Sequence, residues 1–477
     1  MKKIIFILTS ALVISACSDD DYARLNEDPK NPISVPGSFL FTSGVKSLFD
    51  QMGSTSVNNN IFRLVAQQWT ETQYVTETNY DIKNRSIPSA HWNNIYTALY
   101  DLQQARISVQ EDPDLLDGVK ANQSSIITIV EVYAWQQMVD TFGDIPYTEA
   151  LQGTENTVAA YDDAATIYED LLTRITEAYN NFSTGSEGLD SDFIYDGDIS
   201  QWQKLAASIK FKLAMRLSDV NPSLSQQHAN EAIGWGLITS NSDNFTLPYE
   251  PNNTNAHPLY ADLVLSGRQD FVPADTFVDY LNNLEDPRRS VFLDDNLGEN
   301  TYIGGVYGAL NNYANFTHIG EVFYEPDLSG NLLDFAEISF LLAEAAERGG
   351  YNVGASAEEY YTQGITASME YWGLSSAEID AYLMRPEVDY ATAPGTWQEK
   401  IGMQFWIAMY NRGFEAWNVW RKFSSPELRL PAATGNPIPL RFTYPNREYT
   451  LNEANVAAAA SAIGGDEQQT PVFWDVN

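Results

Sequence analysis

The stretch VDTFGDIPYTEA, residues 139–150, ends a buried helix and turns the chain in one step. In the helix before it, apolar residues recur at the spacing of a helical stripe that faces a core. Gly143 stands where a left-handed residue closes a helix, and Pro146 lacks the N–H that another turn would need. The sequence therefore predicts a buried helix that stops at Gly143 and an extended exit, with Asp144 and Glu149 marking an exposed corner.

The size and charge of the chain limit its partners. It has 477 residues, 44% of them hydrophobic, which is enough for one large core or two ordinary ones. Its 27 basic and 64 acidic residues give a formal net charge of −37, which repels phosphates and anionic lipid headgroups. Nucleic acid is therefore excluded as an expected partner, and neutral or cationic ligands remain. The acidic runs at 19–21 and 162–163 are interpreted as solvated charge rather than as metal sites.

The N-terminus has the pattern of a secretory signal, with Lys2 and Lys3 before an apolar run too short to span a bilayer. Ile14-Ser15-Ala16-Cys17 resembles a bacterial lipobox, in which Cys17 is acylated and becomes the mature N-terminus. Acyl chains contribute ~0.8 kcal/mol per buried CH₂, so they anchor a protein without spanning the membrane. Cys17 is the only cysteine, which excludes an internal disulfide or a thiolate metal cage. We predict a signal peptide at 1–16, and a lipid anchor with an extended arm at 17–36.

Residues 37–477 are expected to form a single, mostly α-helical domain. Three capping-box patterns start successive helices, at Ser356 with Glu359, Ser375 with Glu378, and Thr396 with Glu399. The four basic residues of the predicted helix at 199–217 are interpreted as pairing with the acidic surface; they are Lys204, Lys210, Lys212 and Arg216.

The helical periodicity of apolar residues is lost between residues 219 and 331, where loops rich in Asn, Gly, Pro and Tyr predominate. A loop-rich insertion of this length is usually either functional or disordered. Its tyrosines argue against disorder. We therefore expect this segment to be ordered and to carry function.

Five segments resemble the SusD/RagB-like outer-membrane lipoproteins of Bacteroidetes-type bacteria. They are FGDIPYTEA (142–150), WNNIYTALYD (92–101), DISQWQKLAASIKFKLAMRLSDVNP (198–222), DFAEISFLLAEAAERGG (334–350), and a C-terminal signature made of WQEKIGMQFWIAMYNRGFEAWNVWRKF (397–423) with the tail from Ile438 through Trp474-Asp475. The resemblance covers nearly all of the mature chain. It implies tetratricopeptide-like helix pairs that form a scaffold, with long irregular loops carrying the binding surface. It also implies a lipid-anchored position on the cell surface of the outer membrane, and a SusC-like TonB-dependent transporter as partner.

No catalytic constellation stands out. The four histidines, His91, His228, His257 and His318, lack the spacing of a helix-borne metal pair, so no metal site and no cofactor is expected. The sequence has no phosphate-binding Gly/Lys loop, no dinucleotide fingerprint and no Gly-x-Ser-x-Gly elbow. With 64 acids, some carboxylate pair falls at glycosidase distance by chance, so such a pair has little diagnostic value.

The candidate binding residues are the aromatic and polar side chains of the irregular segments. An aromatic ring offers a flat apolar face to the C–H side of a sugar, while Tyr, Asn and Asp satisfy its hydroxyl groups. The residues selected are Trp69, Tyr74, Tyr80 and Asp81 in the first segment, and Tyr302, Tyr307, Asn311, Asn312 and Tyr313 in the second. About half of these rings are expected to pack loops onto the scaffold instead.

The resulting hypothesis is a surface lipoprotein that is not an enzyme and that captures an oligosaccharide for its transporter. A peptide-binding protein of the same architecture remains open, because Asn side chains and rings also hold extended backbones, and an acidic body favours basic peptides. An extracellular glycoside hydrolase with a carboxylate pair is a further alternative. A purely structural envelope protein would show no ligand-sized groove.

Overall fold

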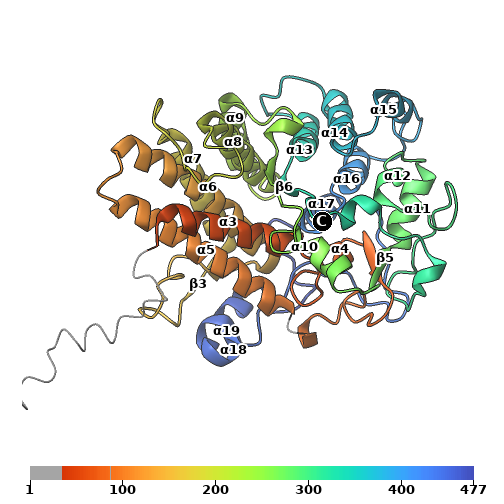
Figure 1. Ribbon diagram of the computed structural model, residues 1–477, viewed down its shortest axis with the longest axis horizontal. Coiled ribbons are helices and arrows are strands. Elements are labelled where there is room, and N and C mark those ends of the chain that lie inside the picture. Colours follow the sequence, from red (N-terminus) through yellow and green to blue (C-terminus); the bar gives the residue numbers. More distant parts are fainter. Residues whose placement is uncertain (1–34, 86, 477) are drawn as a thin grey trace, which may run out of the picture.

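The computed structural model describes residues 35–85 and 87–476. The predicted signal peptide at 1–16, Cys17 and nearly all of the predicted arm lie outside the described residues. Helices predominate, and the β-structure consists of short strands (Figure 1).

The first helical layer is built by neighbours along the chain, each packed on the next. Its members are α3 (Gly37–Gly53), α5 (Ile87–Glu111), α6 (Asp117–Phe142), α7 (Ala164–Asn180), α8 (Ile199–Arg216) and α9 (Pro222–Trp235). In Figure 1 they fill the left half of the molecule. This arrangement confirms the prediction of paired helices, because each long helix buries one apolar side against the preceding helix.

A second group of helices continues the layer, because α13 packs on α8 and then on α14 and α16. The group contains α13 (Phe335–Arg348), α14 (Ala357–Tyr371), α15 (Ser376–Leu383), α16 (Trp397–Ala408) and α17 (Gly413–Phe423). All three predicted capping boxes are present, at the starts of α14, α15 and α16. The side chains of Ser356, Ser375 and Thr396 each accept from the backbone N–H three residues on.

The loop-rich half holds short elements, on the right in Figure 1. The helices are α4 (Phe62–Val65), α10 (Pro258–Tyr260), α11 (Asp275–Asn283) and α12 (Arg289–Phe292), with single turns at Lys83–Arg85, Asn241–Asp243, Ala261–Leu265, Tyr313–Asn315 and Glu321–Tyr324. Near the C-terminus, α18 (Glu448–Leu451) and α19 (Glu453–Ala462) contact each other.

Three small antiparallel sheets tie distant segments together. Strand β1 (Trp69–Glu71) pairs with β5 (Phe271–Pro273), β2 (Ile145–Pro146) with β3 (Tyr161–Asp162), and β4 (Phe245–Leu247) with β6 (Gly330–Leu333). The register of the first sheet places Trp69 opposite Pro273 and Glu71 opposite Phe271. This sheet fixes the loop after β1 beside the loop before β5.

The turn after α6 confirms the predicted stop and corrects one detail. Gly143 has φ +80° and ψ −124°, and its N–H donates to the carbonyl of Val139. Asp144 is buried, not exposed as the sequence suggested, because its carboxylate accepts from the N–H of Ala164 at 2.9 Å. Burial raises the pKa of this carboxyl group. Glu149 is exposed, as expected.

The basic residues of α8 are mostly internal, which corrects their assignment to the acidic surface. Lys210, Lys212 and Arg216 are buried. Lys212 Nζ lies 2.9 Å from Glu337 Oε1 and also pairs with Glu415. The sequence could not show this for Lys212 and Arg216, because their acidic partners lie on α6, α13 and α17, far from α8 in the chain.

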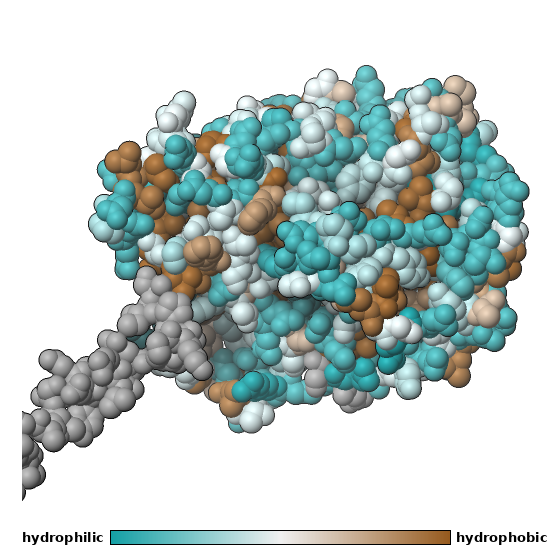
Figure 2. All heavy atoms as spheres, viewed as in Figure 1, coloured by the Kyte–Doolittle hydropathy of each residue, from teal (hydrophilic) through white to brown (hydrophobic). Residues whose placement is uncertain are grey.

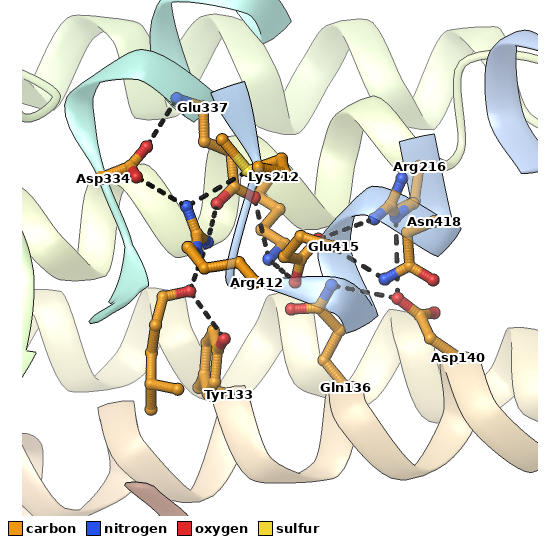
Figure 3. Close-up of polar contacts among 12 residues, drawn as sticks. Tyr133, Gln136, Asp140, Lys212, Arg216, Asp334, Glu337, Arg412, Glu415 and Asn418 are labelled. Carbon is orange, nitrogen blue, oxygen red and sulfur yellow. Dashed lines mark hydrogen bonds and ion pairs between the residues drawn. The ribbon is translucent and has the colours of Figure 1, made fainter. Parts of the chain in front are cut away.

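Figure 3 shows the resulting buried ionic cluster, in which α6, α8, α13 and α17 meet. We define it by its charged members: Lys212, Arg216 and Arg412 with Asp140, Asp334, Glu337 and Glu415. Arg216 Nη2 lies 3.2 Å from Glu415 Oε2, and Arg412 Nη1 lies 2.9 Å from Asp334 Oδ2. The cluster joins the two groups of helices through paired charges.

Candidate functional site

A pocket opens between three loops of the loop-rich half, and we call it the loop pocket. It has a volume of about 440 Å³ and is lined by residues 55–58, by Arg85, and by part of the segments 71–77 and 262–271. Volumes of ~300–1,000 Å³ are typical of small-ligand sites. Most of its lining residues are of polar types, and Tyr74 and Phe271 supply rings.

Tyr74 is the most accessible aromatic residue of this pocket, with 70% of its surface exposed. Its φ is +55°, in the left-handed region that a bulky residue seldom adopts. Its carbonyl accepts from the N–H of Thr76 at 2.7 Å, which closes a tight turn. The neighbouring structure thus holds the ring out from the protein at some conformational cost, and such strain is common where a residue serves binding.

Two carboxyl groups lie in the wall beneath Tyr74. Glu71 and Glu77 are almost fully buried and hydrogen-bond to each other. Burial, this hydrogen bond and the charge of Glu77 raise the pKa of Glu71 to about 9. At neutral pH Glu71 therefore keeps its proton.

The pair is anchored on both sides. Glu71 Oε2 accepts from the N–H and the hydroxyl of Thr78, at 3.0 and 2.8 Å. Arg85 Nε lies 2.8 Å from Glu77 Oε1, and more than a third of the Arg85 side chain is exposed. The wall of the loop pocket therefore presents an arginine whose charge is balanced by the carboxyl pair behind it.

The other two loops are fixed by acids as well. Asp262 Oδ2 accepts from the hydroxyl of Ser54 at 2.9 Å and from the backbone N–H of Thr55 at 2.8 Å and of Ser56 at 3.0 Å. Arg268 pairs with Asp270 through two of its nitrogens. These bonds leave ring faces, guanidinium groups and amides as the groups available to a ligand.

The residues selected from the sequence divide into three sets by position. Trp69, Tyr80, Tyr307 and Asn311 are buried, Tyr302 and Tyr313 are half-buried, and Tyr74, Asp81 and Asn312 are exposed. Only Tyr74 lines the loop pocket.

The buried set lies inside the fold, where a ligand at the surface does not reach it. The Trp69 indole N–H donates to the Tyr410 hydroxyl at 2.8 Å, and the Tyr307 hydroxyl donates to the carbonyl of Leu64 at 2.7 Å. The rings of Tyr80 and Tyr307 pack together with centroids 6.0 Å apart. These rings hold the loops on the helices, because their partners come from distant segments.

The half-buried residues, Tyr302 and Tyr313, belong to the second candidate segment and do not line the loop pocket. Tyr313 stacks on His318 with ring centroids 3.9 Å apart, and the guanidinium of Arg289 lies 5.6 Å from the Tyr302 ring centroid. The segment that carries Tyr302 and Tyr313 is nevertheless joined to the segment that carries Tyr74, because the Asn311 amide donates to the Glu71 carbonyl at 2.9 Å. Sequence reasoning missed Glu71 and Glu77, although Thr-Glu-Thr occurs twice around Tyr74, at 70–72 and 76–78.

Among residues 35–85 and 87–476, no group of three or more His, Cys, Asp or Glu side chains is arranged to hold a metal ion. Within the same residues, no helix has the length and apolar character needed to cross a membrane.

Comparison with known proteins places the chain among binding proteins of the outer membrane. A family described as "Starch-binding associating with outer membrane" matches residues 29–445. A solved chitin-binding protein is 27% identical, with a TM-score of 0.78 over 92% of this chain and 99% of that protein. A SusD-like protein of the Bacteroidetes is 22% identical, with a TM-score of 0.80 over 93% and 100%. A chitin-binding SusD homologue from Flavobacterium johnsoniae is 24% identical, with a TM-score of 0.77 over 92% and 99%. No curated protein sequence matches.

Proposed function

Because this chain belongs to the SusD-like family, we propose that it binds a glycan at the cell surface and delivers it to a SusC-like TonB-dependent transporter. The family's description names starch binding and the outer membrane. The similar protein at 27% identity is named for chitin, a polymer of neutral sugars. A chain of net charge −37 suits such a neutral ligand.

We place the glycan at the loop pocket, and the exposed ring of Tyr74 is the observation that carries this assignment. The ring would stack on the apolar face of one sugar unit, as aromatic side chains do with flat apolar surfaces. Arg85 and Arg268 would donate to sugar hydroxyls at the pocket wall. Asp81, Tyr302, Asn312 and Tyr313 would contact further units of a longer chain, and Trp69, Tyr80, Tyr307 and Asn311 would support the loops from within.

We propose binding without chemical change. A glycosidase separates its two carboxyl groups by about 5–10 Å so that they flank the scissile bond. In the loop pocket Glu71 and Glu77 instead hydrogen-bond to each other and are almost fully buried. No sugar ring fits between two carboxyl groups in direct contact, so this pair is unsuited to hydrolysis.

The proposal includes the N-terminal segment that the sequence suggests. Residues 1–16 would be removed as a signal peptide, Cys17 would carry the lipid, and residues 17–36 would form the arm to a single domain at 37–477, with 219–331 as its loop-rich insertion. Labelling with a radioactive fatty acid in the native host tests this directly. Label on the wild-type protein and none on Cys17→Ser is expected, whereas equal labelling of both would contradict it.

The binding proposal is tested by electrophoresis of the full chain through gels that contain starch or glycol chitin, beside a panel of basic peptides in solution. Retardation by a polysaccharide, with no release of reducing ends on prolonged incubation, is the expected result. Peptide binding without glycan binding would favour the peptide alternative, and release of reducing ends would favour a hydrolase. Either outcome overturns the proposal.

A further inference from the structure

A second and larger pocket lies in the first helical layer, between α5, α6 and α7, and we call it the helix pocket. Its volume is about 650 Å³, within the range of small-ligand sites. It shares no lining residue with the loop pocket. In Figure 1 the three helices lie at the left, whereas β5 lies at the right. The proposed glycan site therefore gives no account of this pocket.

Two acids of the helix pocket, Glu131 and Asp170, already have partners. Glu131 is 2% exposed, and its two oxygens pair with Arg106 and Arg174. Asp170 accepts from the hydroxyl of Tyr147, which itself accepts from Arg174 Nη1 at 3.0 Å. These acids are held by partners from other parts of the pocket, so they are not free to attract a cation.

The cations, in contrast, keep free donors. Arg106 uses Nε for Glu131, at 3.3 Å, and its side chain is 35% exposed. Within the described parts of the chain, its two terminal nitrogens have no hydrogen bond or ion pair. Lys120 Nζ donates one of its three N–H groups to the carbonyl of Gln110 at 2.8 Å, which leaves two N–H groups. The paired terminal nitrogens of a guanidinium match the two oxygens of a carboxylate.

The helix pocket has no net positive charge, so an anion would be held there by free donors at short range. Its lining has three cations, Arg106, Lys120 and Arg174, and four acids, Glu131, Asp170, Asp117 and Glu177. Glu131 and Asp170 already have partners, and Asp117 and Glu177 are exposed, where solvent screens them. At physiological ionic strength charges beyond about 8 Å are largely screened, so the acidic surface far from the pocket acts only weakly there.

We propose that the helix pocket binds the carboxylate of an acidic sugar, with Arg106 and Lys120 as its receptors. The sugar hydroxyls would meet the amide of Gln103 and the hydroxyl of Thr128, which also line the pocket. This site shares no residue with the loop pocket, so the proposal can be tested whether or not a glycan binds there.

The test is calorimetric titration of the full chain with glucuronate and with glucose, which differ at the carboxylate. Glucuronate is expected to bind, with glucose at least about tenfold weaker, the equivalent of one charged hydrogen bond. Arg106→Gln should weaken glucuronate binding by a similar factor, and added NaCl should weaken it further. Arg385→Gln, at an exposed ion pair outside the pocket, is the matched control and should bind as wild type.

Two further variants keep the result decisive. Lys120→Gln removes a receptor without touching Glu131, so it reports on binding even where Arg106→Gln unfolds the protein. Tyr74→Ala should leave glucuronate binding unchanged. Equal binding of glucose and glucuronate, no effect of Lys120→Gln and Arg106→Gln, or loss of binding in Tyr74→Ala would each overturn the inference. Loss in Tyr74→Ala would place the anion in the loop pocket, whereas failure of the neutral glycan to bind anywhere would contradict only the proposed function.

Discussion

Single charged residues determine how the two groups of helices are joined. In the buried ionic cluster Glu415 faces Lys212 and Arg216, and all three side chains are at most 6% exposed. Burial alone would raise the pKa of Glu415, but the charges of Lys212 and Arg216 outweigh it and lower the pKa to about 2. A buried ion of this kind destabilises the fold strongly when its partner is removed.

Glu415→Gln is expected to lower the free energy of unfolding by about 3–5 kcal/mol, because it leaves two buried cations undercompensated. Urea unfolding followed by circular dichroism measures the change. Glu285→Gln is the matched control, since Glu285 pairs with Arg385 at the surface and such pairs contribute at most about 1 kcal/mol. A loss from Glu415→Gln no larger than that of the control would contradict the role of the cluster.

The pKa of Glu71 is raised, whereas that of Glu415 is lowered, so the two acids affect stability in opposite directions as the pH changes. Its folded pKa of about 9 lies above its unfolded value near 4.5, so folding requires a proton between these pH values. The contribution of Glu71 to stability is complete below about pH 4.5 and declines as the pH rises toward 9. Deprotonation at alkaline pH would leave a charged Glu71 carboxylate in a buried position, which burial opposes.

Glu71→Gln keeps the hydrogen bonds and removes the need for the proton. The variant is therefore expected to be more stable than wild type at pH 8 by at least about 1 kcal/mol, the equivalent of one pKa unit, and no more stable at pH 4. Urea unfolding at both pH values measures this, with the exposed Glu111→Gln as control. A gain that is the same at both pH values would show that the proton on Glu71 is not its cause.

At the scale of elements, local signals were readable from the sequence and distant contacts were not. The capping boxes of α14, α15 and α16 could be predicted because both partners lie within four residues. The burial of Trp69 could not, because its hydrogen-bond partner Tyr410 is 341 residues away. For the same reason the sequence yielded Tyr74 as a candidate but not the pocket around it, which needs 262–271 beside 71–77.

The end of α6 offers a prediction about an element. A Cβ at Gly143 would meet no atom within 4 Å, so its requirement for glycine is conformational and follows from φ +80°. Gly143→Ala is expected to destabilise the protein by about 1–3 kcal/mol. Gly234→Ala, at an equally open position inside α9, should instead stabilise it by about 0.4–1 kcal/mol. Thermal unfolding compares the two, and shifts of the same sign would contradict this account of the turn.

At the scale of the whole molecule, a helical scaffold supports a loop-rich half that carries the loop pocket. The face seen in Figure 2 is largely hydrophilic, with hydrophobic residues gathered in separate patches. The fold and the family could be predicted because their helix-ending segments are local patterns. Which of the candidate residues are exposed could be predicted only in part, because exposure depends on how distant loops pack together.

We propose that the loop pocket captures a glycan through the ring of Tyr74. Calorimetric titration of the full chain with chitohexaose tests this by comparing wild type with Tyr74→Ala and with Tyr100→Ala, which removes an exposed tyrosine of α5 outside the pocket. We predict that Tyr74→Ala weakens binding by at least about tenfold while Tyr100→Ala binds as wild type. Wild-type affinity in Tyr74→Ala, or no binding of chitohexaose by the wild-type chain, would contradict the claim.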